Sequence, residues 1–221
     1  MEHLDAQLNV TRSSHNWVTM PGNFDRNNTH TLYPSTNQWG IPELPAADVV
    51  PDRLIAYNDR WKVEHPVPGD AVHFFLDDYR FETMWTKPQR GLSRVMRAGL
   101  ALTPDFSLWQ EMPLAMQLWQ VYRSRWCGAW MRSNGVNVIP TVSWSTPASF
   151  DFAFTGIAYH SIVAVSSVGI RDNDAKKAYL RGMEEMIDRI TPAMVLVYGR
   201  SLGENQFDPD GFRYFKTRWE E

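Results

Sequence analysis

The protein has 221 residues, of which 43% are hydrophobic, and its 22 basic and 25 acidic side chains give a formal net charge of -3. A chain of this length can bury a large core without disulfide bonds or metal ions, so we expect one globular domain. The slightly acidic balance weighs against a protein that coats nucleic acid without sequence preference. No apolar stretch approaches the roughly 20 residues that cross a bilayer, and the first twenty residues lack a secretory pattern. We therefore expect a cytoplasmic protein with no membrane partner.

The first 50 residues are rich in Asn, Thr, Ser and Pro and show neither helical nor strand periodicity, which indicates an extended arm. Its aromatic side chains are Trp17, Phe24, Tyr33 and Trp39. A solvated tail would gain nothing from such side chains, so we expect the arm to pack on the body of the protein. We predict that residues 51–221 form a single domain with a basic, aromatic tail at its C-terminal end.

From residue 54 onward, short apolar runs typical of buried strands alternate with helical segments. The six predicted strands are Leu54–Tyr57, Val72–Leu76, Leu100–Thr103, Val136–Ile139, Ile162–Val165 and Met194–Val197. After the first strand, the starts lie 28, 36, 26 and 32 residues apart, close to the roughly 30 residues of a strand-helix-strand unit. Continuous apolar runs suit parallel strands that are covered on both faces.

Three helices are predicted between these strands. An apolar stripe with a period near 3.6 runs from Asp174 to Ile190 and stops before Pro192. A second, heavily apolar helix begins after Pro113 and ends at the Asn134-Gly135 pair. A third runs from about residue 81 to residue 98, with an interruption near Pro88 and Gly91.

Alternating strands and helices predict an α/β fold. We favour an abbreviated or irregular β/α (TIM-like) barrel with mainly parallel strands, because a full eight-fold barrel takes about 250 residues. An open parallel sheet is the alternative.

In parallel α/β proteins, ligands bind at the carboxyl ends of the strands, so the polar residues that follow each apolar run are the candidates for a site. These are Asp77, Asp78 and Arg80; Asp105 and Ser107; Thr141, Ser143 and Ser145; Ser166 and Ser167; and Tyr198 and Arg200. The sequence therefore predicts that carboxylates, hydroxyls and arginine converge on one face.

Most of these candidates, together with Arg125 and Trp144, are assigned a predicted role. The predicted catalytic residues are Asp77, Asp78, Asp105 and Ser143. One of the adjacent pair Asp77 and Asp78 is expected to face the site while the other caps the next helix. Asp77 and Asp105 are the candidate ligands for Mg²⁺ or another divalent cation. The predicted substrate-binding residues are Arg80, Ser107, Arg125, Thr141, Trp144, Tyr198 and Arg200.

Several other chemistries are disfavoured. His73 and His160 are placed at or before strand starts, so roughly 13 Å of strand separates them from the serines at the strand ends, too far for histidine to activate a serine. Cys127 lies among tryptophans of the second predicted helix and is expected to be an inert core thiol. No glycine-rich dinucleotide motif or P-loop occurs, so we expect no nucleotide cofactor.

Five segments carry a resemblance to a known family. They are Leu76-Asp77-Asp78-Tyr79, Thr103-Pro104-Asp105-Phe106-Ser107, Tyr122-Arg123-Ser124-Arg125-Trp126, Ile139-Pro140-Thr141-Val142-Ser143-Trp144 and Val197-Tyr198-Gly199. In this order they resemble a family of uncharacterised function that bacteria, phages and mobile elements encode. The similarity spans about residues 38–200. It implies a phage or mobile-element setting and assigns no catalytic role to any residue.

Our leading hypothesis is a metal-assisted hydrolase that acts on a phosphodiester or nucleotide at the carboxyl ends of the strands. A glycoside hydrolase would use the same carboxylates without metal. A non-enzymatic phage protein would instead bind a host protein or nucleic acid through the arm and the tail. The sequence leaves these three functions open.

Overall fold

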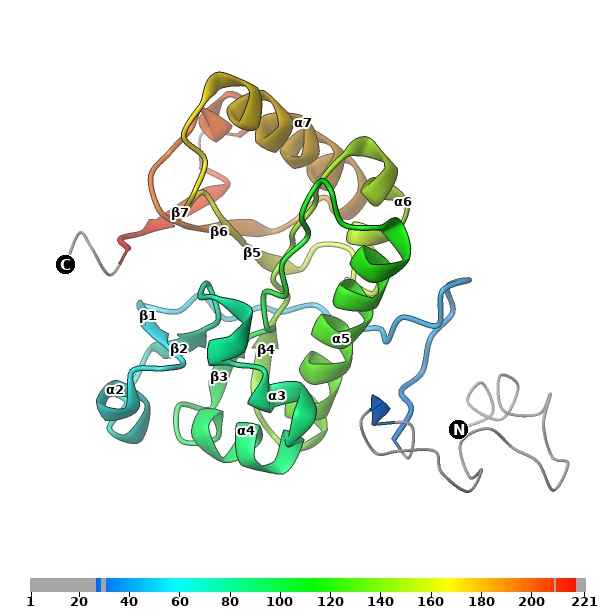
Figure 1. The fold of residues 1–221 in the computed structure, drawn as a ribbon. Coiled ribbons are helices and arrows are strands. Elements are labelled where there is room, and N and C mark those ends of the chain that lie inside the picture. Colours follow the sequence, from blue (N-terminus) through cyan, green and yellow to red (C-terminus); the bar gives the residue numbers. More distant parts are fainter. Residues whose placement is uncertain (1–26, 29–30, 209, 218–221) are drawn as a thin grey trace, which may run out of the picture.

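The computed structural model describes residues 27–28, 31–208 and 210–217. These residues form a mixed α/β fold with seven strands and the helices that connect them (Figure 1). The strands are β1 (Arg53–Ala56), β2 (Asp70–His73), β3 (Leu100–Leu102), β4 (Asn137–Ile139), β5 (Ile162–Ser166), β6 (Met194–Tyr198) and β7 (Phe212–Phe215). The α-helices are α2 (Arg60–Glu64), α3 (Thr83–Thr86), α4 (Pro88–Val95), α5 (Leu114–Ser133), α6 (Phe150–Ala153) and α7 (Asn173–Ile190). Short 3-10 helices cover Asp78–Arg80, Pro147–Ser149 and Glu204–Gln206.

The strands form two parallel sheets, one of four strands in the order β1-β2-β3-β4 and one of three in the order β5-β6-β7 (Figure 1). A parallel bridge between Thr141 and Ala164 links the two sheets just beyond β4. Pro140 has no N–H to donate, which ends the β3–β4 ladder there, and its carbonyl oxygen accepts the N–H of Ala164 at 2.8 Å. Counted across this bridge, the seven strands lie side by side in the same order as they occur along the chain.

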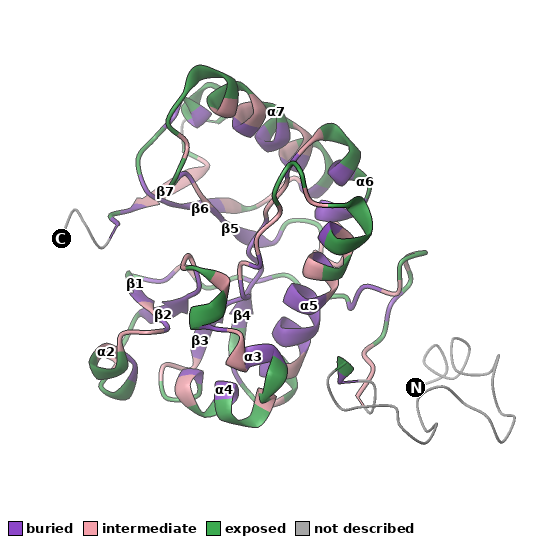
Figure 2. Ribbon diagram, viewed as in Figure 1, coloured by how far each residue is buried: buried purple, intermediate pink, exposed green. Residues whose placement is uncertain are grey.

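The prediction of an α/β fold with parallel strands is confirmed. A closed TIM-like barrel is not confirmed, because neither sheet closes on itself within the described residues. One buried cluster nevertheless draws side chains from all seven strands; its strand members are Leu54, Ala71, Leu100, Leu102, Ile139, Ile162, Ala164, Met194, Leu196, Tyr198 and Phe215. Two further clusters lie between strands and helices, so that one face of α7 and nearly the whole circumference of the second half of α5 are buried (Figure 2).

The three predicted helices are present, and the third is divided before Pro88 as predicted, whereas Gly91 lies within α4 and does not interrupt it. Asp172 begins α7, because its carboxylate accepts the N–H groups of Asp174 and Ala175. The break near Pro88 separates α3 from α4 at Lys87. The prediction omitted the short helices α2 and α6. No helix in the described part of the chain has the length and apolar character needed to cross a membrane.

The predicted basic, aromatic C-terminal tail includes a strand that the sequence did not reveal. Phe212–Phe215 is strand β7, which pairs in parallel with β6 along its whole length. The register sets Val195 against Phe212 and Tyr198 against Phe215. Its residues, Phe-Arg-Tyr-Phe, combine ring side chains with one basic side chain, and three of the four are half-buried, which suits a strand at the edge of a sheet.

The described part of the N-terminal arm lies against the body. The carbonyl oxygen of Thr31 accepts the indole N–H of Trp126 at 2.8 Å, and the ring of Tyr33 meets the same indole edge-on at 5.9 Å between centroids. Farther along, Leu44 forms a parallel bridge with Ile157. Trp17 and Phe24, which the sequence also suggested as packing residues, lie outside the described residues.

Candidate functional site

A cavity of about 820 Å³ opens at the carboxyl ends of the strands. Seven of the residues with a predicted catalytic or binding role line it: Asp77, Arg80, Asp105, Ser107, Ser143, Trp144 and Tyr198. They come from the segments that follow β2, β3 and β4 and from the last residue of β6. Parallel strands that follow one another in chain order place these ends on a common rim, which is why residues more than 100 positions apart share one cavity.

The loops after β3 and β4 hold each other in place. The backbone N–H of Thr141 donates to the hydroxyl of Thr103 at 2.9 Å, and the hydroxyl of Thr141 donates to the carbonyl oxygen of Thr103 at 2.7 Å. Both residues are buried. Two residues farther along each loop, the hydroxyl of Ser143 donates a short hydrogen bond to Oδ1 of Asp105. The hydrogen bonds between the two loops therefore hold Asp105 and Ser143 next to each other.

Burial raises the pKa of Asp105 from 3.8 to about 7, and the nearby negative charge of Asp78 acts in the same direction. The hydrogen bond from Ser143 and the positive charge of Arg125 oppose the rise. A carboxyl group with a pKa near 7 is present in both protonation states at neutral pH, so it can donate and accept a proton. Such groups are enriched at functional sites.

Arg125, a predicted substrate-binding residue, does not line this cavity. Its side chain is buried, and the guanidinium donates to the carbonyl oxygens of Thr141, Ala153 and Thr155 at 2.9, 3.1 and 3.1 Å. Burial lowers its pKa to about 10, while Asp105 opposes the change, so the group stays charged at neutral pH. Arg125 ties α5 to the loop after β4 and to the end of α6.

One of the two adjacent carboxylates, Asp77, faces the site as predicted, but the other, Asp78, has a different role from the predicted helix cap. Asp77 lines the cavity and accepts a hydrogen bond from Nε of Arg80 at 3.0 Å. Asp78 caps no helix. Its carboxylate accepts the backbone N–H of Ser107 at 3.2 Å and the hydroxyl of Ser107 at 2.8 Å. Asp78 thus anchors the loop that carries Asp105, beside the cavity but outside its lining.

Two other predicted substrate-binding residues lie away from the cavity lining. Thr141 is buried and uses its hydroxyl on Thr103. Arg200 is exposed, and its carbonyl oxygen accepts the hydroxyl of Ser167 at 2.8 Å. The prediction placed both residues by their position after a strand, but side-chain direction and loop path also decide which atoms reach a cavity.

Aromatic side chains form much of the cavity wall, a feature that the sequence indicated only for Trp144 and Tyr198. The aromatic lining residues are Phe75, Trp109, Trp144, Tyr179 and Tyr198. Trp144 stacks on Tyr179 of α7 at 5.7 Å, and Phe75 stacks on Tyr198 at 5.2 Å. Trp109 is 65% exposed and stands at the rim. Flat apolar faces of this kind suit a ring-containing ligand.

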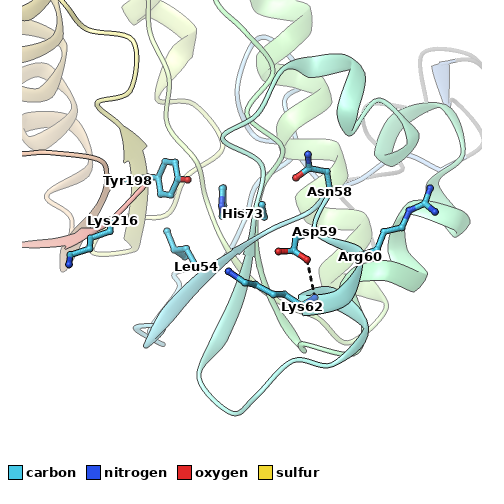
Figure 3. A pocket seen from close by; sticks show the side chains of 9 residues that line it. Leu54, Asn58, Asp59, Arg60, Lys62, His73, Tyr198 and Lys216 are labelled. Carbon is cyan, nitrogen blue, oxygen red and sulfur yellow. Dashed lines mark hydrogen bonds between the residues drawn. The ribbon is translucent and has the colours of Figure 1, made fainter. Parts of the chain in front are cut away.

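His73 is the residue that sequence reasoning placed wrongly. It is the last residue of β2 rather than near its start, because β2 begins at Asp70 and ends before Phe74. His73 lines a second recess of about 430 Å³, together with Tyr198 (Figure 3). The distance used to set it aside therefore does not apply. A single polar residue within the apolar run Ala71-Val72-His73-Phe74 is the sequence signal that could have found it.

The fold and the cavity define a parallel α/β protein with a cavity at the strand ends, lined by a carboxyl group whose pKa is raised. The chain belongs to the family described as a domain of unknown function, DUF4417, whose model matches residues 33–216. It is 49% identical over 215 residues to the Gene 1 protein of Mycobacterium phage L5, covering 96% of this chain and 94% of that protein. It is 47% identical over 212 residues to the Gene 1 protein of Mycobacterium phage D29, covering 95% and 78%. No solved structure matches the chain.

Proposed function

We propose that this phage-type protein is a hydrolase in which Asp105 exchanges a proton with the substrate or with an attacking water. The carrying observation is the partly buried Asp105 carboxyl, with its pKa near 7, held by Ser143 inside a large cavity. When charged, Asp105 can take a proton from water; when protonated, it can give one to the leaving oxygen. We further propose that the seven strands form an incomplete barrel and that the protein works in the host cytoplasm.

We propose a phosphodiester or nucleotide as the substrate. Arg80 lines the cavity with Asp77, and a guanidinium matches the oxygens of a phosphate group. Trp109, Trp144 and Tyr198 offer ring faces on which a base can stack. Ser143 holds Asp105 and lies where it can also orient a substrate oxygen.

A divalent cation such as Mg²⁺ remains part of the proposal, with Asp77 and Asp105 as its ligands. Both carboxylates line the cavity, although the described residues contain no group of three His, Cys, Asp or Glu side chains placed to hold a metal. Hydroxyl, carbonyl and water oxygens would complete the coordination of a hard cation. Because a cation binds the charged form of Asp105, it would compete with the proton. Turnover measured with added Mg²⁺ and with a chelator tests this part.

A glycoside hydrolase is the second candidate, and the aromatic wall of the cavity favours it, since sugar rings pack on such faces. Chromogenic phosphodiesters and glycosides, assayed in parallel, separate the two activities. Turnover of phosphodiesters alone supports the leading proposal, and turnover of glycosides alone replaces it. A protein that turns over neither, and instead captures a host protein or nucleic acid, is a binding protein.

The decisive variant is Asp105→Asn, which keeps the size of the side chain and removes its proton exchange. We expect turnover to fall by about 100-fold or more. Asp188→Asn, on the exposed face of α7, is the matched control and should keep full activity. An Asp105→Asn variant with normal turnover would overturn the proposal.

A further inference from the structure

The cavity that contains Asp105 has a charged side and an uncharged side. Its charged lining residues all follow β2 or β3; they are Asp77, Arg80, Asp105 and Glu111. Among the described lining residues from 142 to 179, which follow β4 or belong to β5, α7 and the loop between them, none carries a charged side chain. Because the strands lie side by side in chain order, these two sets of residues flank the hydrogen-bonded pair of Asp105 and Ser143.

Helix α7 packs on β5 and β6 and forms a wall of the uncharged side. Ala175, Ala178 and Tyr179 line the cavity, and their spacing of three and four residues places them on one face of the helix. Trp144 stacks on Tyr179 with 5.7 Å between ring centroids. One turn farther along, a Cβ on Gly182 would lie 2.1 Å from Nε1 of Trp144, so the indole rests directly on α7. Two methyl groups and two ring faces therefore bound this part of the cavity.

The polar groups on the uncharged side are already engaged within the protein. The hydroxyl of Ser145 donates to the side chain of Gln117, that of Ser166 donates to a backbone carbonyl oxygen at 3.4 Å, and that of Ser143 donates to Asp105. The hydroxyl of Tyr179 is buried, so this residue lines the cavity with its ring. A sugar, which carries hydroxyls around its whole edge, would leave several of them without partners here. A flat ring with apolar faces avoids this cost.

We infer that the uncharged side of the cavity, between α7 and Trp144, binds the base of a nucleotide. The charged side complements it, because Arg80 suits a phosphate group. The substrate then lies across the cavity, with its base against α7, its phosphate toward Arg80 and the bond to be cleaved at Asp105. That the base belongs to the hydrolysed substrate rests on the proposed function; base binding itself does not. Ala175 and Ala178 determine specificity, because their small side chains leave room for the ring.

Methyl NMR of the full-length protein, with isotope-labelled alanine, tests base binding directly. The probes are adenosine and uridine, which carry a base but no phosphate. The methyl resonances of Ala175 and Ala178 should shift with saturation, because a ring bound beside a methyl group changes its magnetic shielding. The methyl resonance of Ala129, which is buried in the cluster between α5 and the four-stranded sheet, should not shift.

Ala178→Leu adds a bulky side chain to the uncharged side and should weaken nucleoside binding by about tenfold or more. Lys177→Leu is the matched control, because it introduces the same side chain one position away, where the lysine side chain is 78% exposed. It should bind the nucleosides within twofold of the unaltered protein. Urea denaturation shows whether each variant keeps its fold, and the methyl titration of the unaltered protein requires no substitution.

The inference is overturned if neither nucleoside moves the two alanine methyl resonances, or if a folded Ala178→Leu variant binds nucleosides within twofold of the unaltered protein. Methyl β-glucoside, titrated in the same way, should leave both resonances unchanged. A saturable shift with this sugar and none with the nucleosides would assign the uncharged side to a sugar ring, which also overturns the inference.

Asp105→Asn separates this inference from the proposed function, because nucleoside binding is measured without turnover. Nucleoside binding together with normal turnover in that variant refutes only the proposed role of Asp105. Loss of turnover in that variant, with no methyl shift in the unaltered protein, refutes only the base-binding inference.

Discussion

Asp105→Asn should stabilise the protein at alkaline pH, although it removes a group that we place in the chemistry. The pKa of Asp105 rises from 3.8 to about 7 on folding, so the folded state disfavours the charged form. Above pH 7 the group is charged in both states, and folding carries the full cost of that charge; below about pH 4 it is protonated in both states, and the cost vanishes. The contribution of Asp105 to stability is thus present at low pH and lost as the pH rises from about 4 to 7.

The size of the effect follows from the shift. One pKa unit corresponds to about 1.4 kcal/mol, so the full rise is worth roughly 4 kcal/mol. Because Asp105 is only partly buried, solvent screening reduces this, and we expect Asp105→Asn to raise the free energy of unfolding by about 1–2 kcal/mol at pH 8. At pH 4 the gain should fall close to zero.

Urea denaturation followed by circular dichroism at pH 4, 6 and 8 measures this directly. Asp188→Asn, on the exposed face of α7, is the control and should change the unfolding free energy by less than about 0.5 kcal/mol at each pH. If Asp105→Asn destabilises the protein at pH 8, or has the same effect at pH 4 and pH 8, the carboxyl is not held in the disfavoured charged form and the reasoning is refuted.

Three further variants probe the surroundings of the cavity. Ser143→Ala removes a hydrogen bond that lowers the pKa of Asp105, so a carboxyl titration should show that pKa rising further; an unchanged or lower value would show that the bond does not favour the charged form. Arg125→Ala leaves three carbonyl oxygens without their donor. We expect it to lower the free energy of unfolding, measured by urea denaturation, by about 3 kcal/mol or more. A decrease below about 1 kcal/mol would show that Arg125 does not hold these segments together. Gly182→Ala would set a Cβ 2.1 Å from Nε1 of Trp144, so we expect about 1–3 kcal/mol of destabilisation and a changed Trp fluorescence, whereas an unaffected protein would mean that the indole does not rest on this helix.

The sequence predicted the strand ends because apolar runs signal burial directly. Six of the seven strands and the shared position of Asp105 and Ser143 followed from those runs and from the rule that parallel strands present their carboxyl ends together. β7 was missed because its residues, Phe-Arg-Tyr-Phe, form neither a continuous aliphatic run nor a strict alternation of apolar and polar side chains. Such a segment becomes a strand only through its pairing with β6, a long-range contact that no local pattern displays.

At the site, too, the features that the sequence did not predict depend on contacts between segments that are distant in the chain. Arg125 seemed able to reach a ligand, yet three backbone carbonyls from distant segments occupy it. His73 was set aside because the predicted strand began two residues and ended three residues too late, and in a strand a few residues decide which end a side chain occupies. The raised pKa of Asp105 depends on burial and on the position of Asp78, neither of which a spacing along the chain contains.

The central claim is that Asp105 exchanges its proton near neutral pH, and carbon-detected NMR of its side-chain carboxyl across pH 3 to 9 tests it most directly. The account predicts a midpoint near 7, far above the ordinary value of 3.8. A midpoint close to 4 would show an ordinary charged carboxylate and contradict the proposed acid–base role.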